Sequence, residues 1–236
     1  MNTNNQNTEF DKYSEKYKKL LKGSFPKFFQ NIDYYSEYKV NEVFNHRKKI
    51  KTQTILDFGC GVGLSLKYFS KYFSNLELWG YDNSSLSLKE IENENGSINL
   101  TSNLDNIPRN HFDAIFIANV FHHINETEHE KTLNDLKRFL KPDGLIYIFE
   151  HNKLNPVTKI IFSMSDLDKN AKMVPIKKFY ELSYKCEMQI VLKKYTLFFP
   201  KQLSFLKIFE KLLNWMPLGM QYLIVIKKKA SKNSPF

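Results

Sequence analysis

The residues best suited to bind a ligand are glycines at alternate positions, which follow a short apolar run. In the segment ILDFGCGVG these are Gly59, Gly61 and Gly63. Glycine permits positive φ angles and lets a ligand touch the backbone. The dinucleotide fingerprint G-x-G-x-x-G needs its third glycine one residue later, where this chain has Leu64. Asp57, which precedes the loop, would repel a pyrophosphate but would suit a cationic ligand.

A second acidic residue follows the next apolar run, in the segment GYDNS. Asp82 lies 19 residues after Gly63. A carboxylate at the end of this strand is placed to accept two hydrogen bonds from ribose hydroxyl groups. Taken alone, Asp82 could also be a helix N-cap. Together with the glycine loop it indicates a site for a nucleoside with a positively charged, phosphate-free tail, and S-adenosylmethionine is such a ligand.

Apolar runs alternate with amphipathic stretches from residue 53 to residue 150. This alternation predicts the strands and helices that position the glycine loop and Asp82. Each run has the length of a buried strand, and each stretch has the spacing of a helix. Such alternation implies a parallel sheet with helices on both faces. The expected strands are 54–58, 76–81, 98–101, 113–118 and 145–150, and the expected helices are 63–73, 84–94 and 126–140, the last ended by a turn at 141–144.

The segments on either side of this core follow other patterns. We expect a polar, disordered segment at 1–8, helices within 9–50, an irregular helical segment at 156–185, strands at 190–199 and 222–228, and an amphipathic helix at 201–214. No repeat or linker is visible, so we expect one domain. Its parts would be an N-terminal helical cap at 1–50, a cofactor-binding core at 51–150, a substrate-side insertion at 151–185, and final strands with a basic helix at 186–236.

Five pieces of the sequence resemble the class I S-adenosylmethionine-dependent methyltransferases and occur in that family's order. They are Ile55–Gly63, Gly80–Ser84, Phe112–Ile115, Asn119–Ile124 and Leu140–Gly144. The resemblance implies an α/β, Rossmann-like doubly wound sheet of seven strands, mostly parallel, with a C-terminal antiparallel hairpin and helices on both faces. The core resembles ubiquinone/menaquinone-type methyltransferases, and more weakly the chain is similar to methyltransferases of bacterial surface-polysaccharide gene clusters.

The resemblance also implies where the methionine and ribose parts of the cofactor lie. The loop from Asp57 to Gly63, which includes Cys60, would hold the methionine part, and Asp82 would hold the ribose. On the helix before the sheet, a Tyr or Lys such as Tyr35 or Lys39 could reach the methionine carboxylate.

By the same resemblance, adenine would lie near Asn83, Asn103 and Leu104. Many relatives carry Asp where this chain has Asn103, but the asparagine carbonyl can still accept a hydrogen bond from the adenine amino group. Asn119 and Val120 would pass under the sulfonium.

Candidates for a catalytic base are expected at the carboxyl ends of the fourth and fifth strands, where open α/β sheets bind ligands. They are His122, His123, Glu150 and His151. A hydroxyl acceptor usually needs a base, whereas a thiol or carbanion-like acceptor needs little help. We expect His151 to act as a base or to orient the acceptor, although a plain surface turn would also explain this position. We identify no set of metal ligands.

Composition excludes several classes of protein. Apolar residues make up 42% and aromatic residues 15%, which excludes a disordered chain, a collagen-like fibre and a coiled coil. Cys60 and Cys186 lie far apart, which argues against a disulfide-stapled domain, a cysteine zinc site and an iron–sulfur site. The first ten residues contain no apolar core of a signal peptide, and no apolar run is long enough to span a bilayer. We therefore expect a cytoplasmic protein.

The net charge of +10 is concentrated in the last quarter of the chain. Residues 171–236 carry 13 lysines and 3 glutamates, whereas the 22 bases and 22 acids of residues 1–170 cancel. With only three arginines in the chain, we do not expect a nucleic-acid partner. The basic quarter could attract an anionic membrane surface at the inner face of the membrane, or a phosphate-bearing substrate, or it could be a solvated surface. The amphipathic helix could rest on a membrane, but we favour an ordinary helix packed on the sheet.

The sequence thus predicts a methyltransferase acting on a small-molecule or lipid-linked sugar acceptor, with oxygen as the favoured atom. One alternative is methylation of RNA or protein, although the sequence has Asn119-Val120-Phe121-His122 where an amino-methylation motif of the N/D-P-P-Y/F type would stand. Another is a catalytically silent subunit that binds S-adenosylmethionine. A nicotinamide-dependent oxidoreductase is the least favoured, because of Leu64 and Asp57.

Overall fold

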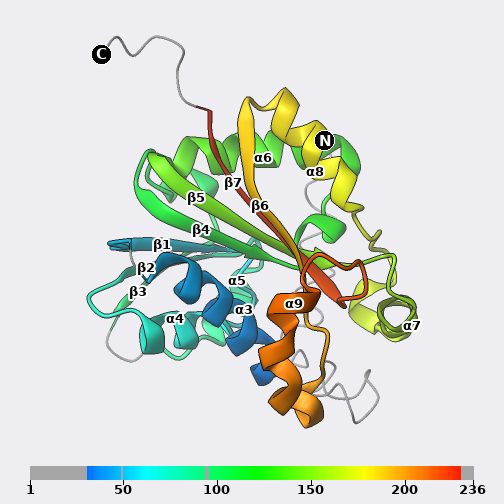
Figure 1. Ribbon diagram of the computed structural model, residues 1–236. Coiled ribbons are helices and arrows are strands. Elements are labelled where there is room, and N and C mark those ends of the chain that lie inside the picture. The colour runs from blue at the N-terminus through cyan, green and yellow to red at the C-terminus, as the bar shows by residue number, and fades with distance from the viewer. Residues whose placement is uncertain (1–30, 49, 94–95, 230–236) are drawn as a thin grey trace.

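A seven-stranded sheet forms the centre of the computed structural model, which describes residues 31–48, 50–93 and 96–229 (Figure 1). The polar segment predicted at 1–8 and the first part of the helical cap lie outside the described residues. The strand order is β3-β2-β1-β4-β5-β7-β6. Neighbours from β3 to β5 are parallel, and β7 pairs antiparallel with both β5 and β6. The predicted mostly parallel sheet with a C-terminal antiparallel hairpin is therefore confirmed.

The strands lie close to the predicted positions. They are β1 (Thr54–Phe58), β2 (Glu77–Tyr81), β3 (Ile98–Thr101), β4 (Phe112–Ala118), β5 (Leu140–His151), β6 (Met188–Thr196) and β7 (Gln221–Lys228). The central strands are buried on both faces, which is why they read as continuous apolar runs in the sequence.

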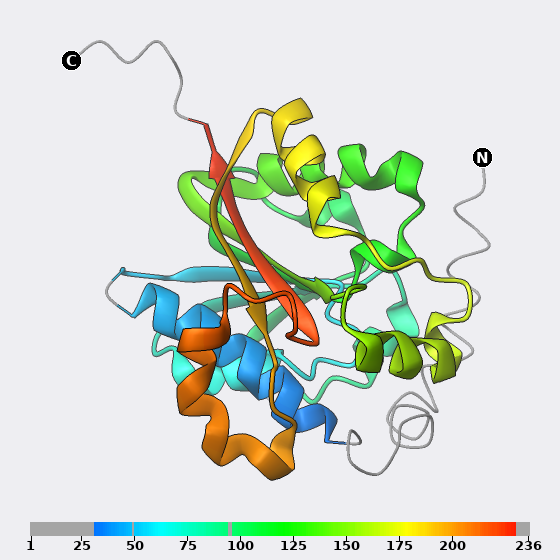
Figure 2. The same cartoon turned by 45° about the vertical axis from the view of Figure 1, so that its right-hand side comes forward.

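Helices cover both faces of the sheet. Those with described bounds are α3 (Ile32–Arg47), α4 (Leu66–Tyr72), α5 (Ser85–Lys89), α6 (His129–Phe139), α7 (Pro156–Met164), α8 (Ile176–Lys185) and α9 (Glu210–Leu213). Leu136 of α6 and Phe179 of α8 belong to the buried cluster on one face, and Val43 of α3 and Phe69 of α4 belong to the cluster on the other. Figures 1 and 2 show these two helix layers on opposite sides of the strands.

Strand β5 differs from the sequence prediction at its beginning. We expected a turn at residues 141–144, but the strand begins at Leu140. The ladder to β4 pairs Phe112 with Leu140 and then Ala114 with Leu145, so four residues of β5 stand opposite one residue of β4. Such an excursion is a bulge, which explains why a Pro-Asp-Gly sequence typical of turns occurs inside a strand.

The predicted helix at 201–214 is the largest correction to the fold. The segment forms a 3-10 helix, η6 (Lys201–Phe209), followed by the single turn α9. Most of its apolar side chains are exposed rather than packed on the sheet, with Leu212 at 71% exposure. The residue that faces inward is Glu210, which accepts hydrogen bonds from the hydroxyl of Tyr38 and the amide of Phe198. The ordinary buried helix that we favoured is therefore wrong, because a buried carboxylate anchors the segment instead of its apolar face.

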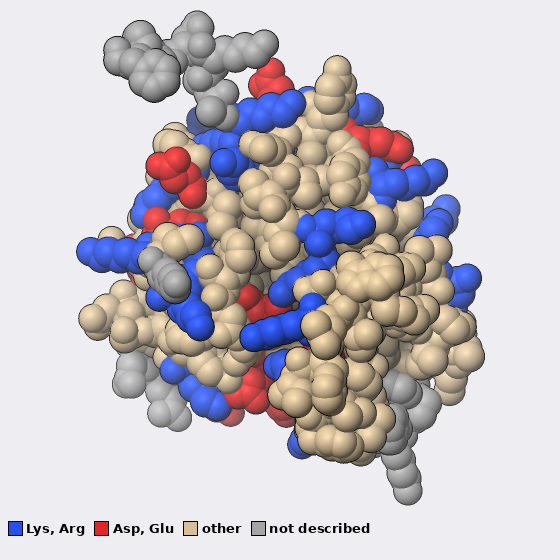
Figure 3. Space-filling model, viewed as in Figure 1, with Lys and Arg blue, Asp and Glu red and all other residues tan. Residues whose placement is uncertain are grey.

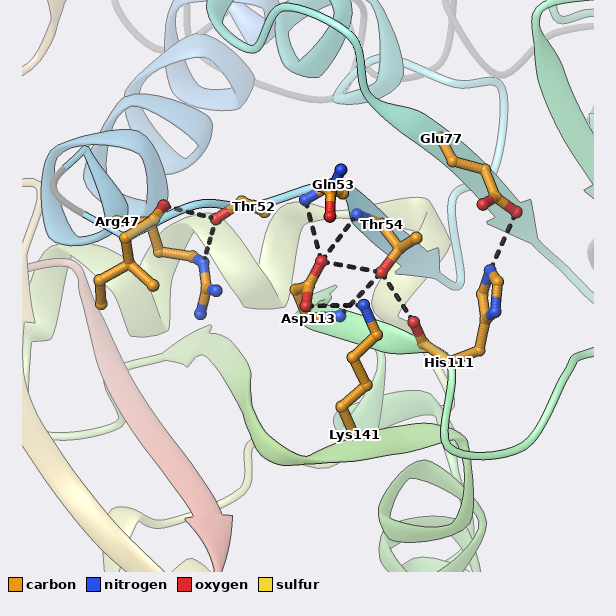
Figure 4. A network of polar contacts seen from close by, with 9 residues as sticks. Arg47, Thr52, Gln53, Thr54, Glu77, His111, Asp113 and Lys141 are labelled. Atoms are coloured by element: carbon orange, nitrogen blue, oxygen red, sulfur yellow. Dashed lines mark hydrogen bonds and ion pairs between the residues drawn. The ribbon is translucent and has the colours of Figure 1, made fainter.

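A polar network holds the amino ends of the strands together, at the edge opposite the cavity described below (Figure 4). The Asp113 carboxylate accepts hydrogen bonds from the amides of Gln53 and Thr54 at 2.9 and 3.0 Å, and pairs with the Lys141 ammonium at 2.8 Å. Burial alone would raise the pKa of Asp113, but the ammonium and the amide donors outweigh it and hold this pKa below its ordinary value. The network ties the start of β1 to β4 and to the β5 bulge.

Candidate active site

A cavity of about 300 Å³ lies at the carboxyl ends of β1, β2, β4 and β5, between α3 and α7. Thirteen of the residues that the sequence singled out line it. From the cofactor set these are Tyr35, Lys39, Asp57, Gly59, Cys60, Gly61, Asp82, Asn83, Asn119 and Val120, and from the catalytic set His122, His123 and His151. The site is thus assembled from segments far apart in the chain.

The glycine loop leaves β1 with its backbone held against β2. The amides of Gly59 and Cys60 both donate to the carbonyl of Tyr81, at 2.7 and 2.9 Å. Gly59 has φ of +77°, and a Cβ built there would lie 2.5 Å from Cγ2 of Val120. Glycine is therefore required at this position by both the backbone conformation and the approach of the neighbouring loop.

Asp82 fastens the glycine loop to the start of α5. One oxygen of its carboxylate accepts a hydrogen bond from the amide of Gly61 at 2.8 Å, and the other accepts one from the amide of Ser84 at 2.9 Å. Asn83 follows it on the cavity wall. Asp82 lies where a ribose could be held, and it also orders the loop that would hold the rest of the ligand.

Asp57 is a buried acid without a hydrogen-bond partner for its Oδ2 atom among the described residues. Burial and the nearby Asp82 carboxylate raise the pKa of Asp57 to about 8, while the Lys39 ammonium opposes this shift. Burial lowers the pKa of Lys39, against the pull of the carboxylates of Glu150 and Asp57. A buried carboxylate with an unused oxygen on a cavity wall is a place for a cationic group of a ligand.

Helix α3 closes the cavity from the side. The side chain of Tyr35, on this helix, lines the cavity wall, and its hydroxyl has no hydrogen-bond partner among the described residues. Tyr35 packs edge to face on Tyr34, with ring centroids 5.4 Å apart. A free phenol and a buried ammonium at Lys39 are donors that suit a carboxylate of a ligand.

Asn119 directly follows β4 and lies in the left-handed backbone region, with φ of +59°. Asparagine tolerates this conformation better than most residues. Its side-chain oxygen accepts a hydrogen bond from Gln221 of β7 at 2.9 Å. The turn directs Val120 onto the glycine loop, so β1, β4 and β7 meet at this point of the wall.

Four of the predicted site residues lie outside the cavity lining. Gly63 ends the glycine loop, with φ of +76° and its Cβ position against Ile91. Asn103 caps the short helix η2 (Leu104–Asn106) by accepting from the amide of Asp105, and Leu104 packs against the core. The proximity of Asn103 and Leu104 to adenine stays a prediction.

Glu150, the fourth, is fully buried and turned toward the backbone after β4. Its Oε1 accepts from the amides of Val120 and Phe121, at 3.0 and 2.8 Å, and its Oε2 lies 2.6 Å from Nδ1 of His122. Burial alone would raise the pKa of Glu150, but the His122 ring outweighs it and the pKa is lowered. Glu150 is thereby a positioning residue that holds His122.

Three histidines and an aspartate gather where β4 and β5 end. Nε2 of His122 lies 3.3 Å from Oδ1 of Asp168, and Nε2 of His123 lies 3.4 Å from the same oxygen. The ring of His151 is 5.1 Å from the ring of His122 and 5.4 Å from that of Phe162 of α7. The aspartate of this cluster therefore comes from the segment after α7.

The three imidazoles differ in their protonation. Burial disfavours the charged form of His122, but the carboxylates of Glu150 and Asp168 outweigh it and raise its pKa to about 9. Burial and the positive His122 ring lower the pKa of His123 and of His151 to about 4. At neutral pH His151 is thus an unprotonated imidazole on the cavity wall.

Sequence reasoning missed several residues of this wall. Asp168 lies in the 3-10 helix η5 (Asp166–Asp168), and Leu197, Met220 and Gln221 come from the C-terminal hairpin. No local motif marks Asp168, since one aspartate in an irregular segment is indistinguishable from a surface acid. Gln221 could have been identified as a site residue only from the direction of β7. This strand is antiparallel to β5, so it begins at the edge of the sheet where the parallel strands end.

Comparisons with known proteins agree with this geometry. Residues 56–148 match the family model described as "Methyltransferase domain". A SAM-dependent methyltransferase from Archaeoglobus fulgidus is 17% identical over 80% of this chain and 94% of its own, with a TM-score of 0.58. A TehB-like SAM-dependent methyltransferase from Corynebacterium glutamicum is 17% identical over 94% and 99%, with a TM-score of 0.59.

A third similar structure is phosphoethanolamine N-methyltransferase 2 from Haemonchus contortus, which was solved with S-adenosyl-L-methionine. It is 16% identical over 81% of this chain, which spans about half (52%) of that longer chain, with a TM-score of 0.58. These structural likenesses show the fold alone. No curated protein matches the sequence.

The fold and the glycine-loop cavity define a class I Rossmann-like methyltransferase. Residues 56–148, which match the "Methyltransferase domain" family, form the S-adenosylmethionine-dependent methyltransferase core of this chain, and S-adenosylmethionine is its methyl donor. The residues present fit this cofactor, because the unpaired oxygen of Asp57 and the close-packed glycine loop offer what a cationic methionine tail requires. The ubiquinone/menaquinone-type subfamily stays a prediction.

Proposed function

We propose that this methyltransferase methylates a hydroxyl oxygen of a small-molecule or lipid-linked acceptor. The observation that carries the proposal is the His151 imidazole on the cavity wall at the end of β5. In the sheet, Asp82 after β2 and His151 at the end of β5 are separated by two intervening strands, β1 and β4. At about 4.8 Å per strand they stand roughly 14 Å apart, which leaves the nucleoside at one end and the reacting groups at the other.

The chain's own residues supply position and a proton acceptor. When bound, S-adenosylmethionine supplies an electrophilic methyl group, and its carbon–sulfur bond breaks with the electron pair left on sulfur. Asp57, Asp82 and the glycine loop would orient this donor, and alignment itself supplies much of the rate. His151 would accept a hydrogen bond from the acceptor hydroxyl. As the oxygen–carbon bond forms, the hydroxyl proton becomes strongly acidic and passes to His151.

The test uses His151→Ala with His111→Ala as its matched control, because His111 lies at the opposite edge of the sheet. We expect His151→Ala to bind S-adenosylhomocysteine as the wild type does and to lose about 10²–10⁴-fold in methyl-transfer rate. The enzyme is incubated with acceptor fractions and a methyl donor labelled with carbon-13. NMR of the product then distinguishes O-, N- and S-methyl groups directly.

An intact rate in His151→Ala would contradict its role, and an N-methyl product on RNA or protein would replace the proposed acceptor class. A chain that binds S-adenosylhomocysteine but transfers no methyl group to any fraction would be the silent subunit.

The lipid-linked form of the acceptor is favoured by one exposed surface. Over η6 and α9 the surface is largely uncharged (Figure 3). Phe205, Ile208 and Trp215 are 69%, 72% and 70% exposed. This apolar face adjoins the start of α7, where Asn155 donates to the carbonyl of Leu218. None of the helices in the described part of the chain is long and apolar enough to cross a membrane.

The occupant that suits this face is an anionic bilayer. The same segment carries Lys201, Lys207 and Lys211, and aromatic residues beside lysines are typical of interfacial helices. Burying a large apolar side chain in the interface contributes about 1.5–3 kcal/mol, and each lysine near an anionic surface contributes about 1 kcal/mol.

We expect the chain to float with vesicles of phosphatidylcholine containing about one-third phosphatidylglycerol, and much less with phosphatidylcholine alone. Phe205→Ser/Ile208→Ser/Trp215→Ser should lose flotation. Tyr184→Ser is the control, because Tyr184 is 79% exposed but lies on α8 at the other end of the molecule. Flotation that is indifferent to anionic lipid, or to the triple substitution, would contradict the membrane contact.

A further inference from the structure

We propose that His122, His123 and Asp168 bind one divalent transition-metal ion on the acceptor side of the cavity. Their ligand atoms all lie within 4.8 Å of one another. All three residues line the cavity. Two imidazoles and one carboxylate form a donor set that suits zinc, iron and cobalt, and not magnesium or calcium, which prefer oxygen ligands.

The distances from Asp168 to the two imidazoles fit a shared coordinated ion better than they fit direct hydrogen bonds. Oδ1 of Asp168 lies 3.3 Å from Nε2 of His122 and 3.4 Å from Nε2 of His123. A hydrogen bond between charged groups is normally about 2.7–2.9 Å long. In a tetrahedral site with bonds of about 2.0–2.2 Å, neighbouring ligand atoms are about 3.3–3.6 Å apart.

Glu150 supplies the arrangement found behind metal-binding histidines. Its Oε2 lies 2.6 Å from Nδ1 of His122, and its other oxygen is held by two backbone amides. A carboxylate at this nitrogen accepts its proton in a hydrogen bond and leaves the lone pair on Nε2, which faces Asp168. Such carboxylate–histidine pairs fix the ring and raise its affinity for a metal.

The two carboxylates of the cluster also favour the binding of a cation. Glu150 and Asp168 bring two negative charges to a buried place, with side chains 0% and 11% exposed. A divalent ion would neutralise both carboxylates while the histidines stay uncharged.

The ion would also activate the acceptor for methyl transfer, and this part of the inference rests on the proposed function. Three protein ligands leave a coordination position open, as in catalytic zinc sites. An acceptor hydroxyl bound there would become more acidic, and its proton would pass to His151 as the oxygen–carbon bond forms. The ion would also tie η5, in the predicted substrate-side insertion, to the core of the fold.

Metal binding can be measured without any acceptor. The purified chain is stripped with a chelator, dialysed and titrated with Co²⁺, and the visible absorption bands of four- or five-coordinate cobalt are followed. We expect one equivalent to bind and to be displaced by Zn²⁺ but not by Mg²⁺. Asp168→Asn and His123→Ala should each weaken Co²⁺ binding roughly 100-fold or more.

Asp166→Asn is the matched control, because Asp166 lies in the same turn but pairs with Lys169 at the surface. It should bind Co²⁺ as the wild type does. Calorimetry with S-adenosylhomocysteine on every variant shows that each is folded and keeps its cofactor site.

A wild type that binds S-adenosylhomocysteine but shows no saturable Co²⁺ or Zn²⁺ binding overturns the metal site and leaves the proposed methyl transfer standing. Equal Co²⁺ affinity in Asp168→Asn and Asp166→Asn overturns the ligand set. Metal binding that is lost only in the ligand variants, together with an N- or S-methyl product, keeps the site and removes the proposed hydroxyl chemistry.

Discussion

Replacement of Gly59 by alanine is expected to abolish binding of S-adenosylhomocysteine and to lower the free energy of unfolding by about 2–5 kcal/mol. Its φ of +77° disfavours any residue with a Cβ, at a cost of about 1–2 kcal/mol. The new Cβ would also lie 2.5 Å from Cγ2 of Val120, and such overpacking costs about 1–3 kcal/mol more. Thermal unfolding with and without the ligand measures both effects.

Gly96→Ala separates the two causes. Gly96 has φ of +60°, but nothing lies within 4 Å of its Cβ position. This control should lose only the conformational part of the stability and keep full ligand affinity. In Gly59→Ala/Val120→Ala, where the clashing methyl groups are gone, we expect part of the lost stability to return. Ligand binding by Gly59→Ala at wild-type strength would contradict the close packing of the loop.

Replacement of Asp57 by asparagine is expected to weaken S-adenosylhomocysteine binding by about 10–100-fold, because a hydrogen bond to a charged group contributes about 1.5–3 kcal/mol. The carboxylate would hold the ligand's ammonium group with its unpaired Oδ2. Adenosine, which has no ammonium, should bind Asp57→Asn and the wild type equally, and is the control ligand. Calorimetry of both ligands on both proteins tests the assignment.

The same residue should make binding depend on pH. In the free protein, burial and the Asp82 carboxylate raise the pKa of Asp57 to about 8, and the Lys39 ammonium opposes this rise. The thiol of Cys60 also lies close to the Asp57 carboxylate. Below pH 8 the acid is protonated and must lose its proton to bind a cation, so the dissociation constant should fall as pH rises from 6 to 8 and then level off.

Asp57→Asn should show no such slope between pH 6 and 8. Lys39→Met removes the other group that could titrate in this range. If Asp57 causes the pH dependence of the dissociation constant, this dependence persists in Lys39→Met. A flat profile in the wild type would contradict a neutral Asp57 in the free protein.

Much of the core could be predicted from the sequence because local patterns decide it. The run at 54–58 is buried along its whole length, and β1 has the predicted bounds. The glycine loop and Asp82 lie on the cavity wall because a strand must deliver them to the same edge of the sheet. The antiparallel hairpin followed from family resemblance, since two late apolar runs do not by themselves state their direction.

Other features depend on contacts between distant segments, which no local pattern reveals. Asp168 reaches His122 and His123 only after α7 has folded over the end of β5. At 201–214 the periodicity is helical, but the side chain that is buried is Glu210, because Tyr38 and the backbone near Phe198 satisfy its charge. Periodicity predicts an amphipathic face and does not tell whether protein, solvent or lipid covers it.

The place of β7 in the sheet has a consequence for biosynthesis. This strand lies between β5 and β6, so β5 has no partner on that side until residues 221–228 have left the ribosome. Until then a nascent chain exposes the backbone of Ile146–Phe149 as an apolar edge, which is prone to pair with other chains. The amide of Gln221 that holds Asn119 arrives with the same strand. The part of the cavity wall that Gln221 and Asn119 form together is therefore completed only after β7 has joined the sheet.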